Sequence, residues 1–316
     1  MVISTTSSDM IRARLTGKRM SLANTLIAAA LLLTLLSSIV ILITLLADTL
    51  AKAIPVFESR GMSFVTSSLA PQAERAGILQ GIMGSLALMG FVVVIAFPLG
   101  VAAAVYLEEY APDTRMTRLV NANIRNLAGV PSIVYGILGL FLFVKVINGT
   151  FGFAEQISGR NLVAGGLTLA VLVLPIMIIT TAEALRAVPQ ALREASMGVG
   201  ATKWETIRHH VLPVAMPAIL TGSVLTVARA FGETAPLLLA GAALSQYFAT
   251  DQGAGFFDLI GNQSYTALPL VIYNFARQPD TEFVQLTAAS IVVLLVMLLS
   301  VNALAIIARD RFERAS

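Results

Sequence analysis

The sequence has no cysteine and only two histidines, His209 and His210, which are adjacent. Without cysteine, disulfide bonds and thiolate metal sites are excluded. Neighbouring residues of a helix point about 100° apart, so the two histidines form a poor pair of metal ligands. We therefore expect this chain to bind no metal and no cofactor of its own.

Charged residues are also scarce. Of the 316 residues, 12% are charged and 57% are apolar, whereas soluble domains are about 25% charged and roughly 45–50% apolar. A soluble fold could not cover its surface with so few charges, so membrane lipid is the expected solvent. The net charge of only +3 gives no reason to expect nucleic acid as a partner.

Six stretches are long and apolar enough to cross a bilayer as helices, which takes about 20 residues each. They are expected at Asn24–Leu46, Gly77–Leu107, Leu127–Ile147, Leu162–Thr181, Val214–Ala240 and Phe283–Ile307. The first stretch is followed by Ala51-Lys52-Ala53, which imitates a signal-peptide cleavage site. Its apolar run exceeds the roughly 7–15 residues of a signal peptide, so we interpret it as an uncleaved span. The expected fold class is an all-α integral membrane protein with about six transmembrane helices.

Lysine and arginine concentrate in alternate segments between the predicted spans. With the N-terminus inside, the inner segments hold fourteen of them and the outer loops hold six, while Arg229 lies within a span. Positive charge collects on the cytoplasmic side of membrane proteins, so both termini are expected in the cytoplasm. The resulting plan has a cytoplasmic tail at 1–23, a transmembrane domain at 24–308 with a long outer loop at 241–282, and a second cytoplasmic tail at 309–316.

The segment between the fourth and fifth spans, residues 189–213, predicts two short helices outside the membrane. Pro189 suits the first position of a helix, where its missing N–H costs nothing. Gly198 and Gly200 permit the positive φ that a sharp turn needs. The first helix is therefore expected to end near these glycines.

A second helix is expected to begin at Thr202. Thr202 and Glu205 form a Thr-x-x-Glu capping box. Trp204, Ile207 and Val211 then make an apolar stripe at helical spacing. Such a stripe outside the membrane either binds a groove of a partner protein or rests on the base of its own helix bundle, and both interpretations stay open.

The same segment resembles the EAA loop of ABC importer permeases. That pattern is Glu-Ala-Ala, three residues, Gly, nine residues, a hydrophobic residue, one residue and Leu-Pro. The residues in register are Glu194, Ala195, Ser196, Gly200, Leu212 and Pro213. Two positions depart, because Ser196 replaces the second alanine and His210 stands where an aliphatic residue is usual. In that family the loop docks on the ATPase subunit, so the resemblance implies docking through Glu194, Ala195, Gly200, Leu212 and Pro213, with Trp204 of the apolar stripe beside them. We call residues 189–213 the coupling segment.

The chain carries no nucleotide-binding loop of its own. A P-loop needs Gly-x4-Gly-Lys followed by Ser or Thr to cradle phosphates. The only Gly-Lys pair, Gly17-Lys18, is followed by Arg19, and Gly198-Val-Gly-Ala-Thr-Lys203 has the wrong order. ATP and magnesium are therefore expected at a partner ATPase. No nucleophile–base pair or metal cluster stands out, so we expect no enzyme activity in this chain.

The fifth predicted span contains two charges, Arg229 and Glu233. A charge at the bilayer centre costs about 2.5–3.5 kcal/mol, so both should face the bundle interior or a water-filled path. At i and i+4 they share one face of a continuous helix. Two interpretations stay open: a structural ion pair, or a substrate pathway in which Arg229 donates N–H groups to an anion, with Glu233 and Thr234 beside it.

The residues around this pair are similar to a hallmark of PstA-type permeases of phosphate ABC importers, Arg-x-x-Gly-Glu-Thr-Ala-Pro. Two more stretches agree, Ala128-Gly-Val-Pro-Ser-Ile-Val-Tyr-Gly136 and Ala267-Leu-Pro-Leu-Val-Ile-Tyr-Asn-Phe-Ala276. The resemblance covers the chain from about residue 77 to 300. It implies the type I ABC importer permease fold, phosphate as substrate and a bacterial inner-membrane location. It further implies a second permease subunit (PstC-type), two copies of an ATPase (PstB-type) and a periplasmic phosphate-binding protein (PstS-type).

The outer loop at 241–282 is rich in aromatic residues: Tyr247, Phe256, Phe257, Tyr265, Tyr273 and Phe275. They are interpreted either as an interfacial belt at headgroup level or as a gate or landing surface for a substrate-delivering protein. Three alternatives to a phosphate importer also stay open. They are an ABC permease for phosphonate or another oxyanion such as sulfate or molybdate, an ATP-independent anion channel or secondary transporter, and a sensor of phosphate status.

Overall fold

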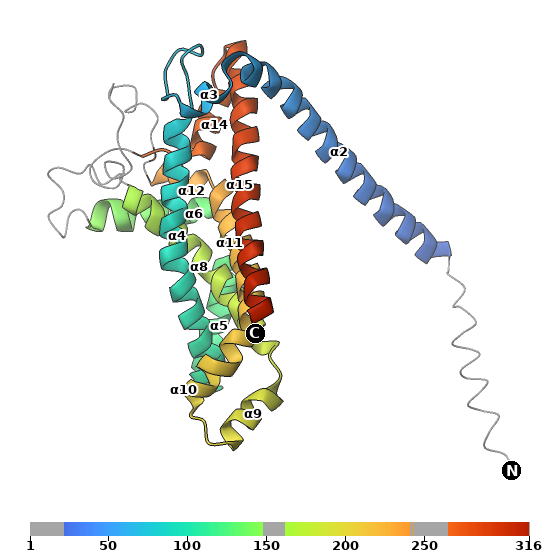
Figure 1. The fold of residues 1–316 in the computed structure, drawn as a ribbon, viewed down its shortest axis with the longest axis vertical. Helices are drawn as coiled ribbons and strands as arrows, with labels where there is room; N and C mark the ends of the chain where they lie inside the picture. Colours follow the sequence, from blue (N-terminus) through green and yellow to red (C-terminus); the bar gives the residue numbers. More distant parts are fainter. Residues whose placement is uncertain (1–21, 148–161, 241, 243–264, 316) are drawn as a thin grey trace. The chain divides into compact units, whose positions relative to one another are not determined.

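The computed structural model describes residues 22–147, 162–240, 242 and 265–315. In these residues the regular structure is entirely helical (Figure 1). The chain divides into two units, Met1–Ala51 and Lys52–Ser316. Five described helices are long and apolar enough to cross a membrane, and a bent pair of shorter helices adds a sixth if it counts as one span. This confirms the all-α class and the expected number of spans.

The described part of the first unit belongs to one helix, α2 (Leu22–Arg60). The predicted span Asn24–Leu46 lies within it, and the helix continues beyond Leu46 to Arg60. Polar side chains in the apolar stretch hydrogen-bond to their own helix; the Thr34 hydroxyl, for example, donates to the carbonyl of Leu31 at 2.8 Å. A hydroxyl satisfied in this way needs no water, which suits a helix surrounded by lipid.

Four further long helices belong to the second unit. They are α4 (Leu79–Val105), extended by the π-helical turn η1 (Tyr106–Tyr110), then α8 (Leu162–Arg186), α11 (Leu212–Gly232) and α15 (Thr281–Ala315). α8 packs against α4 and α11, and α11 packs against α15. The second, fourth and sixth predicted spans are thus confirmed, with ends that differ by several residues.

The third predicted span, Leu127–Ile147, is wrong as a single helix. The chain forms α5 (Arg115–Ala128), then α6 (Ser132–Gly139) and the π-helical η2 (Leu140–Ile147). The axis bends by 101° between α5 and the segment that starts at Ser132. Pro131 explains the break, because proline has no N–H to continue the hydrogen-bond ladder and disfavours helical backbone at the preceding residue. The Tyr135 hydroxyl donates to the Leu127 carbonyl at 2.8 Å and so satisfies a carbonyl near the break.

The fifth predicted span, Val214–Ala240, is also wrong as one continuous helix. α11 ends at Gly232, Glu233 has an extended backbone with φ −78° and ψ 115°, and α12 (Ala235–Leu239) starts after Thr234. Pro236 accounts for this break, because its ring would clash with the carbonyl of Gly232 in an unbroken helix. The two broken regions meet, since α6 packs against α12.

Two short helices in the described outer segments contribute buried residues to the core. α3 (Met62–Thr66) buries Phe64, and α14 (Leu268–Ala276) packs on α4 and α15. Tyr265 and Phe275 are 0% and 2% exposed, so the interfacial-belt interpretation is wrong for these two residues. Tyr273 is 41% exposed, and Tyr247, Phe256 and Phe257 lie outside the described residues.

Glycines allow the closest approaches between these elements. A Cβ atom at Gly84 of α4 would lie 1.9 Å from the carbonyl oxygen of Thr266. This oxygen belongs to the backbone, so it cannot move aside as the end of a flexible side chain could. A Cβ atom at Gly139 would lie 2.1 Å from the Thr168 hydroxyl on α8. Small residues at such contacts let helices pack by van der Waals attraction where lipid supplies no hydrophobic driving force.

Two alanine substitutions in α4 test this packing. Gly84→Ala should destabilise the protein by about 1–3 kcal/mol, the usual cost of overpacking. Gly90→Ala is the matched control in the same helix, because nothing lies within 4 Å of its new Cβ atom. Thermal unfolding of the two purified variants in one detergent measures the difference, and equal melting temperatures would contradict the packing described here.

Candidate coupling and anion sites

The first helix of the coupling segment is α9 (Gln190–Gly198), with Pro189 at its N-cap. Gly200 has φ of +95°, as the sequence predicts, and it closes the turn by donating from its N–H to the Met197 carbonyl at 3.0 Å. Gly198 does not have positive φ; it is the last residue of the helix. One glycine rather than two therefore makes the turn.

The second helix begins at the predicted capping box. The Thr202 hydroxyl accepts from the Glu205 N–H at 3.3 Å, and the Glu205 carboxylate accepts from the Thr202 N–H at 2.8 Å. α10 (Lys203–Thr206) then passes through the π-helical η4 (Ile207–Val211) directly into α11. The second short helix is therefore the first part of the fifth span. Together α10, η4 and α11 form one continuous helical element from Lys203 to Gly232, which we call the rod.

The apolar stripe of the second helix divides between two surroundings. Ile207 and Val211 are 1% and 0% exposed and belong to a core cluster with Leu185 of α8. Trp204 is 53% exposed. Two residues of the stripe thus rest on the bundle's own base, and the third remains on the surface.

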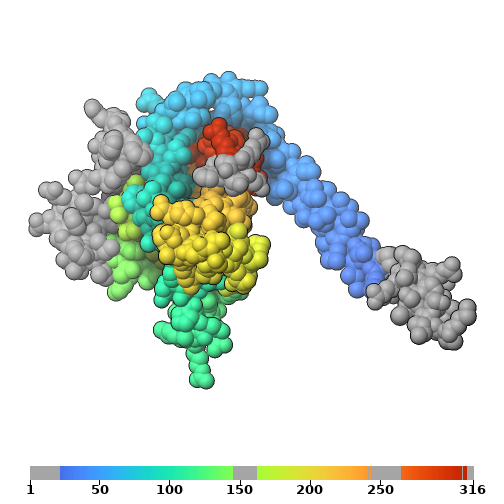
Figure 2. All heavy atoms as spheres, turned by 60° about the horizontal axis from the view of Figure 1, so that its bottom comes forward, coloured from blue at the N-terminus to red at the C-terminus, as the bar shows by residue number. Residues whose placement is uncertain are grey.

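An exposed apolar surface surrounds the turn of the coupling segment. Met197, Val199 and Trp204 are 45%, 88% and 53% exposed, and we call them the apolar tip. The segment, yellow in Figure 2, comes forward in that view. Sequence reasoning identified Trp204 and missed the other two residues, because both belong to the turn region, which the periodic stripe does not include.

The residues that match the EAA pattern are mostly exposed. Glu194, Ala195, Gly200 and Pro213 are at the surface, and Leu212 is half-buried. Ser196, the departure from the pattern, is buried with its hydroxyl 3.0 Å from the Thr206 hydroxyl. This hydrogen bond joins α9 to α10, so the serine has a structural partner where alanine would have none.

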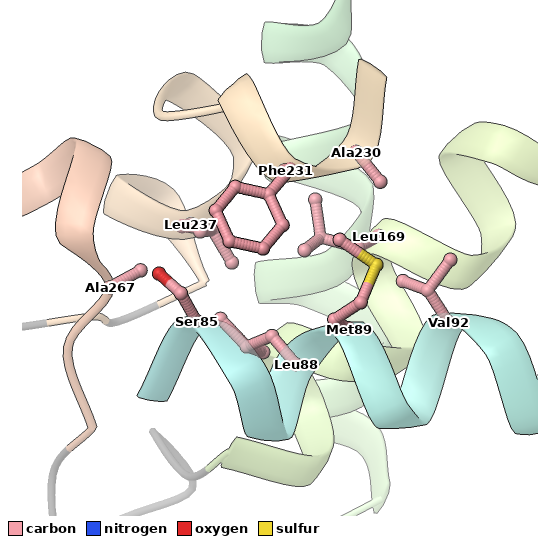
Figure 3. A pocket seen from close by; sticks show the side chains of 9 residues that line it. All are labelled: Ser85, Leu88, Met89, Val92, Leu169, Ala230, Phe231, Leu237 and Ala267. Carbon is pink, nitrogen blue, oxygen red and sulfur yellow. The ribbon is translucent and has the colours of Figure 1, made fainter. Parts of the chain in front are cut away.

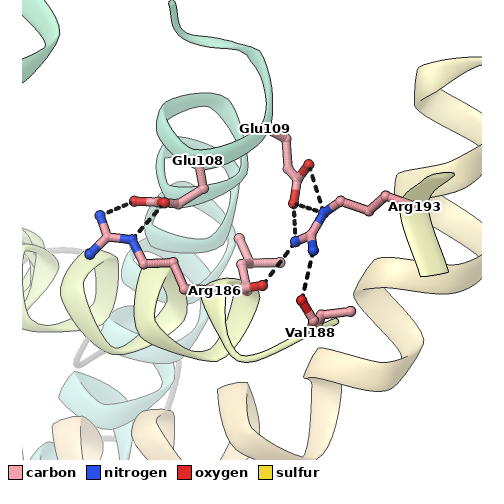
Figure 4. Close-up of polar contacts among 6 residues, drawn as sticks. Glu108, Glu109, Arg186, Val188 and Arg193 are labelled. Carbon is pink, nitrogen blue, oxygen red and sulfur yellow. Dashed lines mark hydrogen bonds and ion pairs between the residues drawn. The ribbon is translucent and has the colours of Figure 1, made fainter. Parts of the chain in front are cut away.

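Two ion pairs hold the base of the coupling segment (Figure 4). Arg193 of α9 binds the Glu109 carboxylate with an Nη2–Oε1 distance of 2.7 Å, and the two side chains are 13% and 8% exposed. The same guanidinium donates to the carbonyls of Val188 and Leu185 at 2.8 and 2.9 Å. A buried arginine with these partners has little unsatisfied donor capacity.

The second ion pair lies beside the first. Arg186, the last residue of α8, donates from Nε to Oε2 of Glu108 at 2.7 Å. Its side chain is 48% exposed, and the Glu108 side chain is 14% exposed. Sequence reasoning missed both pairs. The available signal was that Glu108-Glu109 and Arg186 fall at the ends of two predicted spans on the same side of the membrane.

The anion site suggested by the sequence has a different geometry from the expected one. Arg229 and Glu233 form an ion pair with an Nε–Oε1 distance of 3.6 Å. Because Glu233 lies beyond the end of α11, the two do not share a helical face, and their pair instead connects the helix to the break. Their side chains are 49% and 18% exposed, so the guanidinium keeps donors available. Thr234 is the N-cap of α12 and makes no capping hydrogen bond with its side chain.

A small cavity next to this break is not the anion site. Its lining residues are Ser85, Leu88, Met89, Val92, Leu169, Ala230, Phe231, Leu237 and Ala267 (Figure 3). Its volume is about 10 Å³, close to the space of one water molecule. Ser85 is its one polar side chain, and the hydroxyl already accepts from the Leu268 N–H at 2.8 Å. The cavity is too small and too apolar for a tetrahedral oxyanion.

The two ion pairs at the base predict unequal effects of mutation. Arg193→Gln leaves the Glu109 carboxylate buried without its partner and should destabilise the protein by about 3–5 kcal/mol. Arg186→Gln breaks a pair whose arginine is half-exposed and screened by solvent, so the loss should be about 0–1 kcal/mol. Thermal unfolding of both variants compares them. Equal losses, or a larger loss for Arg186→Gln, would show that burial does not set the strength of these pairs.

Comparison with known proteins places these features in a family. Residues 96–315 match the family described as binding-protein-dependent transport system inner membrane component. The phosphate transport system permease protein PstA of Yersinia pestis is 34% identical over 86% of this chain and 85% of its own length. PstA of Haemophilus influenzae is 35% identical over 76% of this chain and 77% of its own length.

Other matches are shorter. The probable ABC transporter permease proteins YqgI and YqgH of Bacillus subtilis are 35% and 40% identical, and the chain spans about half of each, 56% and 50%. Among solved structures, a bacterial alginate ABC transporter chain superposes with a TM-score of 0.65 at 16% identity, covering 90% of this chain and 93% of that one. A chain of the inward-facing MetNI methionine ABC transporter gives a TM-score of 0.52 at 22% identity, covering 75% and 95%. The structural similarity establishes the fold of type I ABC importer permeases, and with the family match over residues 96–315 it shows that this chain belongs to the binding-protein-dependent transport system inner membrane components.

Proposed function

We propose that this chain is the A-type permease subunit of an ATP-driven importer that moves inorganic phosphate across the cytoplasmic membrane. The observation that carries the proposal is the similarity to PstA proteins, 34–35% identical over 76–86% of this chain. The chain itself performs no bond chemistry. Its proposed partners are a PstC-type permease, two PstB-type ATPase subunits, which bind ATP and magnesium, and a PstS-type phosphate-binding protein.

The coupling segment is the proposed contact with the ATPase. Its apolar tip, Met197, Val199 and Trp204, has no partner among the described residues, and apolar side chains at a helix–turn–helix suit a groove on another protein. The exposed residues of the EAA pattern, Glu194, Ala195, Gly200 and Pro213, belong to the same segment and would complete the contact, with half-buried Leu212 at its edge.

The helical rod from Lys203 to Gly232 is the proposed path of motion. Trp204 and Arg229 are 25 residues apart on it, or about 38 Å at 1.5 Å per residue. α9 is fixed to the end of α4 by Arg193 and Glu109, and to α10 by Ser196 and Thr206. A displacement of the docked ATPase would therefore reach α4 through α9 and the anion site through the rod.

Arg229 is the proposed contact for phosphate in transit. A guanidinium offers paired N–H donors that match the oxygens of a tetrahedral oxyanion. The Glu233 carboxylate, 3.6 Å from the Arg229 guanidinium, partly neutralises its positive charge. A weaker charge suits transient binding of phosphate, because a pathway that binds its ion tightly releases the ion slowly. Because Glu233 lies at the helix break, a change of backbone there would alter the pair.

Uptake of labelled anions tests the substrate and the energy source. Vesicles carrying this chain with its proposed partners should accumulate phosphate, but not sulfate or molybdate, and only with ATP inside. Arg229→Gln should lower phosphate uptake at least about tenfold, as loss of a charged contact worth about 1.5–3 kcal/mol predicts. Arg311→Gln, at an exposed position near the end of α15, is the matched control and should transport normally.

The outcomes of this experiment separate the transport alternatives. ATP-independent flux would point to a channel or secondary transporter. ATP-driven uptake of another oxyanion would keep the importer and replace its substrate. Normal phosphate uptake by Arg229→Gln would leave the arginine as a structural ion pair with Glu233.

The lack of cysteine gives a direct test of orientation and docking. Val199→Cys, in the apolar tip, should react with a membrane-impermeant maleimide only from the cytoplasmic side, and bound ATPase should slow the reaction at least about tenfold, as burial in an interface removes access. Gln278→Cys, exposed just beyond α14, should react only from the outer side and regardless of the ATPase. Labelling of Val199→Cys at full speed in the assembled complex would exclude the apolar tip from the contact.

A further inference from the structure

α5 (Arg115–Ala128) presents a basic strip that the proposed transport cycle does not use. Arg115, Arg118 and Arg125 fall within an arc of about 80° when successive residues turn by 100°. All three are exposed. They lie on a 14-residue helix with no fully buried residue, so the strip is a surface feature rather than part of the core.

This basic strip has almost no anionic partner. Within the described residues, Arg115 and Arg125 make no ion pair and no side-chain hydrogen bond. Arg118 lies 3.7 Å from the Asp113 carboxylate, but the two side chains are 67% and 84% exposed, so the attraction is weak. The first turn of α5 contains no acidic residue, and the N-terminus is capped by the neutral Thr114 side chain, which accepts from the Thr117 N–H at 3.3 Å.

An exposed apolar strip runs along the neighbouring sector of the same helix. Met116, Leu119 and Leu127 are 68%, 57% and 46% exposed, and Asn123 is the one polar side chain that falls between them in this sector. The remaining apolar side of α5 carries Val120 and Ile124, which are half-buried. The helix as a whole packs against α8. An amphipathic helix whose basic and apolar strips are both free is typical of a helix in the membrane interface.

The position of α5 along the chain agrees with an interfacial location. Four residues, 111–114, separate it from η1, where Glu108 and Glu109 mark the polar end of α4. In the orientation proposed above, this end faces the cytoplasm, where the leaflet carries anionic lipid that attracts basic residues close to the surface.

We propose that α5 binds anionic phospholipid of the cytoplasmic leaflet. Arg115, Arg118 and Arg125 hold the phosphate groups of the lipid, while Met116 and Leu119 lie against its acyl chains. Inorganic phosphate is also an anion, but it has nothing for the apolar strip to contact, so the lipid fits both strips and the free anion fits one. The inference rests on the proposed orientation and is independent of which anion the importer carries.

Lipid retention by the assembled complex tests the inference. The complex is exchanged into nanodiscs of equal phosphatidylglycerol and phosphatidylcholine, and the phosphatidylglycerol that stays bound is measured by native mass spectrometry. The triple variant Arg115→Gln, Arg118→Gln and Arg125→Gln should bind phosphatidylglycerol on the order of a hundredfold more weakly, since each of the three basic residues near an anionic surface contributes about fivefold. The matched variant with lysine at the same three positions keeps the charge and should stay within about threefold of the unmodified complex.

Two outcomes would overturn the proposal. One is equal retention of phosphatidylglycerol by the glutamine and unmodified complexes. The other is displacement of the bound lipid by excess inorganic phosphate, which would assign the strip to the free anion. Labelling of Val199→Cys and uptake of labelled phosphate, both measured in closed vesicles that carry the same variants, report the orientation and the transport function. Failure of either can therefore be told apart from failure of the lipid site.

Discussion

Lipid offers no water to a polar group, and that constraint explains most of the arrangement of this protein. Backbone polar groups within the bilayer must find their partners inside the molecule, and a polar side chain there gains by doing so. The Thr34 hydroxyl therefore donates to its own helix, and the Tyr135 hydroxyl donates to the Leu127 carbonyl where proline interrupts the chain. Outside the membrane, burial within the protein has a similar effect at the base of the coupling segment, where Arg193 combines a carboxylate with two carbonyls. Breaks and charges occur where such partners are available.

The sequence predicts the features of this fold that are local. Apolar runs of sufficient length mark the long helices, because the thickness of the bilayer fixes how many residues a span needs. The capping box at Thr202 and the turn at Gly200 are also local, since each depends on residues within four positions. The two broken spans were missed for a related reason. Pro131 and Pro236 are visible in the sequence, but membrane helices often continue through proline, so the sequence does not show which proline ends a helix.

Long-range pairing is the part that one sequence cannot reveal. Glu109 and Arg193 are 84 residues apart, and nothing between them indicates that they meet. The two helices predicted within residues 189–213 are present, yet the sequence did not separate Ile207, which is buried against the bundle, from Trp204, which is exposed. The proposed anion site also depends on contacts that are distant in the sequence. Arg229 and Glu233 were recognised as a pair, but the backbone of Glu233 determines its geometry, and that depends on Pro236 and on packing against α6.

The π-helical turn η4 gives the rod a property that a uniform α-helix lacks. Such a turn contains one residue more than the α-helical ladder around it. Return of Ile207–Val211 to α-helical hydrogen bonding would shift the register by one residue and rotate Trp204 by about 100° relative to Arg229, with an axial change of only about 1.5 Å. The covalent chain and both ends of the helix would stay intact. The proposed connection between the apolar tip and Arg229 could therefore transmit a rotation as well as an axial displacement.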